Sequence, residues 1–261
     1  MTILLFPGQG AQKVGMARDL ADAFPAARAA LDAIDAAFDT PLTSVMWDGP
    51  DHALTLTHNA QPAILAHSVA VLAAVGERLG NVVAAAGHSL GEYSAWVAAG
   101  ALDATEAARL VRRRGALMYE AGQARPGAMA AVLGLDTAQV EAACIEVSVG
   151  TPDVVVAANL NAPDQTVISG DPAAVERAGE GCKARGAKRV LTLNVSGAFH
   201  SPLMEPAVAG LRDALARAAF AAPAFPVTAN ATAQAATTAE EAARLLATQL
   251  TAPVRWVESM R

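Results

Sequence analysis

Apolar and polar positions along the first part of the chain predict strands and helices in alternation. Two short apolar runs, at residues 2–6 and 82–86, have the length and composition of buried strands. Between them, the Ala-rich segments 20–38 and 61–79 have the composition of helices, and Pro62 is tolerable in the first turn of the second one. Strands and helices that alternate in this way are typical of an α/β fold.

The pattern changes after a turn at residues 124–127. Strand-like and helix-like segments then follow in the order β-α-β-β-α-β, which is the ferredoxin-like unit. We expect strands at 128–133, 154–159, 165–169 and 188–194, with helices at 137–147 and 172–185. Because this unit is complete in itself, we predict that residues 126–195 form an inserted ferredoxin-like subdomain. Residues 1–125 and 196–261 then form one discontinuous large domain.

The last part of the chain returns to longer helical segments. A helix is predicted from near Ser201, its cap, to residue 219, and a short strand at 226–229. We expect a polar loop at 230–238, a helix at 239–250 and a new helix beginning near Val254.

The turn after the strand at 82–86 carries the sequence Gly-His-Ser-Leu-Gly, which is the G-x-S-x-G pattern. Strand, G-x-S-x-G and helix together form the context of a nucleophile elbow. Ser89 then lies on a tight turn, and glycines flank it because side chains there would collide with the neighbouring strand and helix. The N–H of Leu90, at the helix N-terminus, could stabilise an oxyanion. The alternative is that Ser89 is an ordinary helix N-cap.

One arginine interrupts the apolar face of the helix predicted over 105–121. Steps of 100° per residue place its apolar residues on one face, and Arg114 alone among the charges falls within that arc. A charge on an inward face needs a partner. Either an internal carboxylate pairs with Arg114, or the carboxylate of a ligand does, a role that suits the planar guanidinium.

Two other positions could complete the chemistry of Ser89. His200 follows a Ser-Gly turn near a predicted helix N-terminus, where the positive helix end keeps the imidazole neutral and available as a base. The turn after the first strand could offer a backbone N–H and the Gln9 side chain to a site at the edge of the sheet. A structural histidine and an ordinary tight turn are the alternatives.

Composition excludes several classes of function. The 261 residues are 53% hydrophobic and 17% charged, with a formal net charge of -6, which argues against a nucleic-acid surface. No apolar run has the length of a membrane span, so we expect no membrane insertion. The three histidines before residue 70 match no metal motif, and the two cysteines, Cys144 and Cys182, form neither a metal pattern nor a disulfide framework. We therefore expect no metal site and a cytoplasmic location, since no signal peptide precedes the first strand.

Five segments together resemble the malonyl-CoA:acyl carrier protein transacylases, whose relatives are the acyltransferase domains of polyketide synthases. These segments are FPGQGAQ at 6–12, GHSLGEYSA at 87–95, RRG at 113–115, GAFHSPLM at 197–204 and QLTAPVRW at 249–256. The resemblance spans the chain in the right order. It implies an α/β-hydrolase-like large domain with an inserted ferredoxin-like small subdomain, in agreement with the insertion predicted above.

The resemblance also assigns roles to individual residues. It implies that Ser89 is the nucleophile, that His200 is its base, and that the N–H groups of Gln9 and Leu90 form the oxyanion hole. Arg114 is similar to the arginine that binds the malonyl carboxylate. The backbone carbonyl of Gln249 matches the group that orients the histidine. Further positions that match the lining of the substrate site are Phe199, Gln61, His88 and Asn159.

The activity implied is ping-pong transfer of a malonyl group from malonyl-CoA to the phosphopantetheine thiol of acyl carrier protein, in fatty acid or polyketide biosynthesis. Malonyl-CoA and acyl carrier protein are the expected partners, and no resident cofactor is expected. A serine hydrolase on the same elbow is one alternative, with Asp103 or Asp153 as the third group of a triad. A non-catalytic scaffold that binds carrier protein is another.

Overall fold

The computed structural model describes residues 1–261, except for the side chain of residue 77. The chain forms two compact units, each assembled from separate segments. The first contains residues 1–116, 211–229 and 234–246. The second contains residues 117–210, 230–233 and 247–261.

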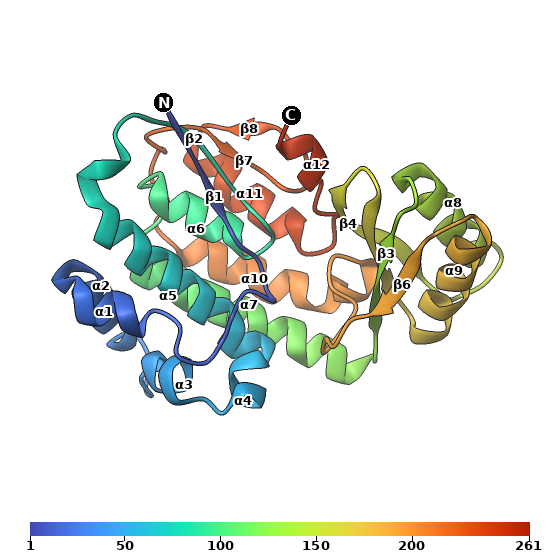
Figure 1. Cartoon of the computed structure of the whole chain (residues 1–261), viewed down its shortest axis with the longest axis horizontal. Coiled ribbons are helices and arrows are strands. Elements are labelled where there is room, and N and C mark those ends of the chain that lie inside the picture. The colour runs from blue at the N-terminus through green and yellow to red at the C-terminus, as the bar shows by residue number, and fades with distance from the viewer. The chain divides into compact units, whose positions relative to one another are not determined.

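A four-stranded sheet with the strand order β1-β2-β7-β8 forms the centre of the first unit (Figure 1). Its strands are β1 (Thr2–Phe6), β2 (Val82–Gly87), β7 (Val227–Thr228) and β8 (Ala235–Ala236). The pairs β1–β2 and β2–β7 are parallel, while β7–β8 is antiparallel. The carboxyl ends of β1 and β2 therefore meet at one edge of the sheet, where open α/β sheets bind ligands.

The prediction that residues 2–6 form a buried strand is wrong for alternate residues. Ile3 is 62% exposed and Leu5 is 55% exposed, whereas Phe6 is buried. Among the described strands, β1 pairs only with β2, so it is an edge strand. Successive side chains of a strand point to opposite faces, so the exposure of Ile3 and Leu5 shows that one face of β1 is open.

The helices of the first unit differ from the prediction at two prolines. The single helix expected over 20–38 is two helices, α1 (Arg18–Ala23) and α2 (Pro25–Asp35), because Pro25 has no N–H to continue a helix and instead begins a new one. The helix expected from residue 61 begins earlier, as α5 (Thr57–Val75), so Pro62 lies inside it and not in its first turn. A 3₁₀ turn, η1 (Gly76–Leu79), follows.

The remaining helices of the first unit are α3 (Leu42–Asp48), α4 (Asp51–Thr55), α6 (Gly91–Ala98), α10 (Glu205–Arg217), which begins in the second unit, and α11 (Ala239–Gln249), which ends there. Helix α6 packs against β1, β2 and β7. Helix α7 (Ala104–Ala124) begins in the first unit and ends in the second. Among the described residues, no helix is both long enough and apolar enough to span a membrane.

The second unit contains an antiparallel sheet with the strand order β4-β5-β3-β6. Its elements follow the predicted order: β3 (Ala128–Leu133), α8 (Thr137–Ser148), β4 (Val155–Ala162), β5 (Gln165–Gly170), α9 (Pro172–Ala184) and β6 (Arg189–Thr192). Asp136 caps α8 by accepting a hydrogen bond from the Ala138 N–H. Helices α8 and α9 bury a core against one sheet face that includes Ala130, Val132, Ile168 and both cysteines.

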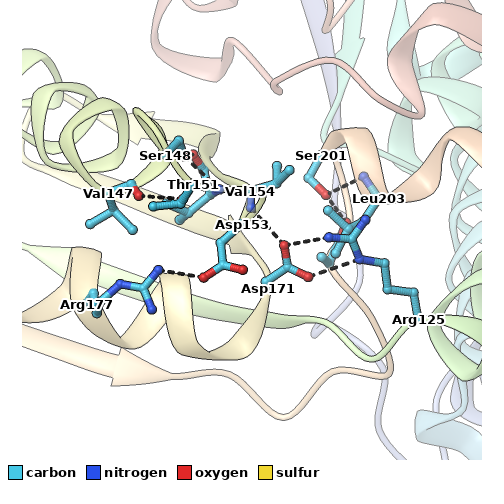
Figure 2. Close-up of polar contacts among 12 residues, drawn as sticks. Arg125, Val147, Ser148, Thr151, Asp153, Val154, Asp171, Arg177, Ser201 and Leu203 are labelled. Carbon is cyan, nitrogen blue, oxygen red and sulfur yellow. Dashed lines mark hydrogen bonds and ion pairs between the residues drawn. The ribbon is translucent and has the colours of Figure 1, made fainter.

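An ion pair joins Arg125, the residue after α7, to Asp171, the residue after β5 (Figure 2). Arg125 Nε and Nη2 donate to the two carboxylate oxygens of Asp171 at 3.0 and 2.8 Å. Asp171 also accepts from the Val154 N–H at 2.8 Å, and Arg177 donates to the neighbouring Asp153 at 2.7 Å. Because the Arg125 pair is bidentate, it fixes direction as well as distance at the start of β3.

The last segments contain two elements where the prediction differs. The polar loop expected at 230–238 includes strand β8. The helix expected near Val254 is α12 (Trp256–Ser259), and Val254 instead forms a parallel bridge with Asn159 on β4. A 3₁₀ turn, η2 (Pro202–Met204), precedes α10 and is capped by the Ser201 hydroxyl as predicted.

Candidate active site

Ser89 lies on a strained turn between β2 and α6. Its φ of 52° is in the left-handed region, which non-glycine residues rarely adopt. A Cβ on Gly87 would lie 1.9 Å from the carbonyl oxygen of Gly91, and a Cβ on Gly91 would lie 2.6 Å from that of Phe6. The turn therefore requires both glycines, as predicted. The N-cap residue of α6 is Leu90 and not Ser89.

The Arg114 guanidinium contacts the Ser89 hydroxyl. Arg114 is 1% exposed, and its Nη2 donates to Ser89 Oγ at 3.0 Å. Its Nη1 donates to Oε1 of the buried Gln61 at 2.7 Å. The Tyr93 ring lies 5.8 Å from the guanidinium carbon. The helical pattern predicted the burial of this cation correctly, and the structure brings Ser89, Gln61 and Arg114 together.

Glu92 is a fully buried carboxylate that the sequence analysis did not single out. Burial lowers the pKa of the Arg114 guanidinium, whereas the negative charge of Glu92 acts in the opposite direction. Burial also raises the pKa of the Tyr93 hydroxyl, so the tyrosine stays neutral. Glu92 is thus an internal counter-charge for Arg114. The available signal in the sequence was that Glu92 is the only carboxylic acid within the segment 91–98.

The two predicted oxyanion donors lie in the same unit as Ser89. Across the described part of the chain, neither the Gln9 N–H nor the Leu90 N–H has an acceptor, so both are available to a ligand. The Gln9 side chain donates to Thr57 Oγ1 at 3.2 Å. His88, half-buried beside Ser89, lies against Gly8, where an added Cβ would be 2.8 Å from the His88 Nδ1.

His200 belongs to the second unit and is 3% exposed. Its Nδ1 lies 3.0 Å from the backbone carbonyl oxygen of Gln249. That oxygen can only accept, so Nδ1 carries the hydrogen and Nε2 is left as the basic nitrogen. His200 also has a left-handed φ, at 56°. Ser89 and His200 are two of only four such non-glycine residues in the described chain.

Close backbone packing holds the loop before His200 against the end of α7 and the start of β3. A Cβ on Gly122 would lie 2.1 Å from the Ser196 carbonyl oxygen, and one on Gly127 would lie 2.5 Å from the Ala198 nitrogen. Phe199 is buried beside Gly197, whose added Cβ would lie 3.4 Å from the ring. Sequence reasoning missed these glycines because their partners are more than 70 residues away.

The carbonyl of Gln249 is itself held by buried groups. The Gln249 side chain donates to Asn230 Oδ1 at 3.5 Å, and the Asn230 carbonyl accepts from the Arg255 N–H at 3.0 Å. The Val254 N–H donates to Ala158 and the Val254 carbonyl accepts from Leu160, which fastens this segment along β4 beside Asn159. His200, Gln249, Phe199 and Asn159 therefore all belong to the second unit.

The acids proposed for a hydrolase triad have other partners. Asp103 accepts from the N–H groups of Thr105 and Glu106 at the start of α7. Asp153 pairs with Arg177. Among the described residues, the histidine, cysteine and acidic side chains form no cluster that could hold a metal ion.

Comparison with known proteins identifies this arrangement. The model of the acyl transferase domain family matches residues 3–261. The chain belongs to the acyl transferase domain family. A malonyl CoA-acyl carrier protein transacylase of Bacillus subtilis (strain 168) is 44% identical over 256 residues, which are 98% of this chain and 80% of the relative. The enzyme of the same name from Escherichia coli (strain K12) is 44% identical over 257 residues, which are 98% of this chain and 82% of that relative.

Solved structures of acyl transferases share the fold. An acyl carrier protein S-malonyltransferase from Vibrio cholerae O1 superposes with a TM-score of 0.94 at 42% identity, covering 98% of this chain and 83% of that one. A malonyl-transacylase in complex with a type II PKS acyl-carrier protein superposes with a TM-score of 0.91 at 43% identity. The match covers 97% of this chain and 82% of that one. The mixed α/β fold of this chain is therefore that of the malonyl-transferring members.

Proposed function

We propose that this acyltransferase is a malonyl-CoA:acyl carrier protein transacylase, acting in fatty acid or polyketide biosynthesis. The observation that carries the proposal is the buried Arg114 guanidinium, which donates to the Ser89 hydroxyl and to Gln61. A nucleophile beside a buried cation suits an acyl group that ends in a carboxylate. The names of the relatives and the complex of one of them with an acyl-carrier protein support the same substrates.

In the first half-reaction, Nε2 of His200 takes the Ser89 proton as Oγ attacks the thioester carbon of malonyl-CoA. The N–H groups of Gln9 and Leu90 bind the tetrahedral oxyanion. When the intermediate collapses, the carbon–sulfur bond breaks and His200 returns its proton to the CoA thiolate. The product is a malonyl ester on Ser89.

In the second half-reaction, the phosphopantetheine thiol of acyl carrier protein loses its proton to His200 and attacks the ester carbonyl. The carbon–oxygen bond to Ser89 breaks, and His200 protonates the departing Oγ. The Gln249 carbonyl keeps the required tautomer of His200 throughout, so no third acid is needed. The protein supplies no resident cofactor, since phosphopantetheine is carried by the partner.

Selectivity follows from the burial of Arg114. Malonyl brings a carboxylate to the guanidinium, whereas acetyl leaves the cation without that partner. Truncating one member of a buried, hydrogen-bonded charge pair, here the malonyl carboxylate, costs on the order of 2–5 kcal/mol, or roughly 1.5 to 3.5 decades in rate or affinity. Gln61, His88, Phe199 and Asn159 are proposed to line the acyl site.

We also propose the finer architecture and location. The large domain, residues 1–125 and 196–261, is α/β-hydrolase-like, and residues 126–195 are a ferredoxin-like subdomain. The βαββαβ order and the antiparallel sheet β4-β5-β3-β6 support the second assignment. The expected location is the cytoplasm.

The experiment that tests this function is intact-mass spectrometry after incubation with malonyl-CoA. Wild-type protein is expected to gain one malonyl group, located on Ser89 by peptide mapping, and Ser89→Ala is expected to gain none. His200→Ala should load slower by at least two orders of magnitude, because general-base catalysis contributes about 10²–10⁴-fold.

Ser94→Ala is the matched control, because Ser94 is a buried serine in the same helix α6. It should load like the wild type. Loading of Ser89→Ala at the wild-type rate would overturn the proposal. Release of free malonate in place of transfer to the carrier protein would instead establish a hydrolase.

A further inference from the structure

The first turns of helix α5 carry two buried polar side chains, and both lead to the candidate site. Thr57 and Gln61 lie one turn apart, on the same face of the helix. Gln61 accepts a hydrogen bond from the Arg114 guanidinium. Thr57 Oγ1 accepts one, at 3.2 Å, from the side-chain amide of Gln9, a proposed oxyanion donor. The same part of α5 therefore contacts the buried cation and the loop after β1.

Thr57 is itself fixed by close packing between α5 and α7. A Cβ on Gly115 would lie 2.7 Å from both the Thr57 carbonyl oxygen and the His58 Cα, so the two helices meet here backbone to backbone. Gly115 directly follows Arg114 in the sequence. Because backbone packed this closely cannot shift unless a helix moves, the Thr57 hydroxyl is a rigid anchor for its partner.

The peptide group between Gly8 and Gln9 requires such an anchor. Its N–H is the proposed oxyanion donor, and its plane turns by rotation about the backbone bonds of Gly8 and Gln9. Gly8 has no Cβ to restrict that rotation. Packing against His88 limits the Gly8 side, where an added Cβ would lie 2.8 Å from both the Nδ1 and the carbonyl oxygen of His88. On the other side, the Gln9 side chain is tied to Thr57.

A simpler role for this hydrogen bond is to satisfy a buried hydroxyl, which is costly to leave without a partner. Ser68 of the same helix meets that need locally, because its hydroxyl donates to the Ile64 carbonyl at 2.9 Å. Thr57 is instead joined to a loop 48 residues away. Its partner there is the residue whose backbone N–H is available to a ligand, which favours a role in positioning that N–H.

We propose that Thr57 is a positioning residue for acyl transfer: its hydroxyl anchors the Gln9 side chain and so keeps the Gln9 N–H directed at the oxyanion. The inference rests on the proposed function and adds a residue that acts through Gln9. A donor that is already in place stabilises the developing oxyanion more than one that must first turn toward it. Since every thioester forms this oxyanion, the effect of Thr57 does not depend on the acyl carboxylate.

The test is Thr57→Val, which keeps the shape of the side chain and removes its hydroxyl. The maximal rate of Ser89 loading from malonyl-CoA is expected to fall about 10- to 100-fold, because the donor is misplaced and not removed. The half-saturating concentration of malonyl-CoA and the ratio of malonyl to acetyl loading should stay unchanged, since Arg114 and Gln61 remain. Thr57→Ser, which retains the hydroxyl, should recover most of the lost rate.

Gln9→Met tests the same hydrogen bond from the other side, because it removes the side-chain amide and keeps the backbone N–H. Its loading rate is expected to fall as much as that of Thr57→Val. The double variant Thr57→Val/Gln9→Met should be no slower than either single variant, since both changes break one interaction. A purely structural threonine would instead give losses that multiply in the double variant.

Thr43→Val is the matched control, because Thr43 is a buried threonine of the first unit whose hydroxyl bonds to Asp35. It should unfold at lower denaturant concentration than the wild type and still load malonyl at the wild-type rate. Wild-type loading by Thr57→Val or by Gln9→Met, multiplied losses in the double variant, or a changed ratio of malonyl to acetyl would each overturn the positioning role. Failure of the wild type to load malonyl would instead overturn the proposed function.

Discussion

Arg114 combines full burial with a positive charge, and this combination organises the candidate site. Its helical position predicted an inward-facing cation, because only apolar residues share its arc. Its partners could not be predicted in the same way. Gln61 and Ser89 lie 53 and 25 residues away from Arg114 in the sequence. The apolar pattern of one helix does not show which distant residues pack against it.

A variant of Glu92 tests whether this carboxylate balances the charge of Arg114 in the ligand-free protein. Glu92→Gln keeps the shape of the side chain and removes its charge. We expect the free energy of unfolding to fall by about 3–5 kcal/mol, because a buried charge then loses its counter-charge. Free malonate should raise the melting temperature of the variant more than that of the wild type, since its carboxylate replaces the missing charge.

A double-mutant cycle with Arg114→Met separates charge balance from packing. If Glu92 balances Arg114, the Glu92→Gln change costs less in the Arg114→Met background. The Glu92→Gln change could instead lower the free energy of unfolding equally in both backgrounds, with malonate raising the melting temperatures of the variant and the wild type equally. That result would show that Glu92 contributes by packing alone.

At the scale of elements, the elbow was predictable and several short elements were not. Local sequence predicts the strand β2, the G-x-S-x-G turn and α6, because an apolar run followed by this pattern is typical of a strand–turn–helix elbow. Strands β7 and β8 have two residues each, too few to show a period. The break at Pro25 follows from proline geometry, and the early start of α5 follows from tertiary packing. The Ala-rich composition of these segments indicates neither.

Gly87→Ala tests the crossing of β2 and α6. Its methyl group would meet the Gly91 carbonyl oxygen at 1.9 Å, so the backbone must shift. We expect a loss of at least about 1–3 kcal/mol in unfolding free energy, measured by denaturant titration, and loss of Ser89 loading.

Gly181→Ala is the control, because it lies inside α9 with only the Arg185 side chain and the Ala143 methyl nearby, at 3.3 and 3.6 Å. It should be neutral or stabilising by up to about 1 kcal/mol. A Gly87→Ala protein as stable and as readily loaded as the wild type would contradict the account of the elbow.

At the scale of the whole molecule, the proposed machinery is divided between two compact units. Ser89, Arg114, Gln61 and the oxyanion donors belong to the first, and His200, Gln249, Phe199 and Asn159 belong to the second. The β-α-β-β-α-β order of the second unit was visible in the sequence because each element is long enough to show its period. The bridge from Val254 to Asn159 was not, since it joins single residues about 95 positions apart.

The central claim is that Arg114 selects an acyl group that carries a carboxylate for transfer to Ser89. The most direct test gives Arg114→Ala and wild-type protein an equimolar mixture of malonyl-CoA and acetyl-CoA, and measures the acyl group on Ser89 by intact mass. We predict malonyl on the wild type, and on the variant a shift toward acetyl by roughly 1.5 to 3.5 decades in the ratio. An unchanged ratio, with both loadings reduced equally, would contradict the claim and make Arg114 a structural residue.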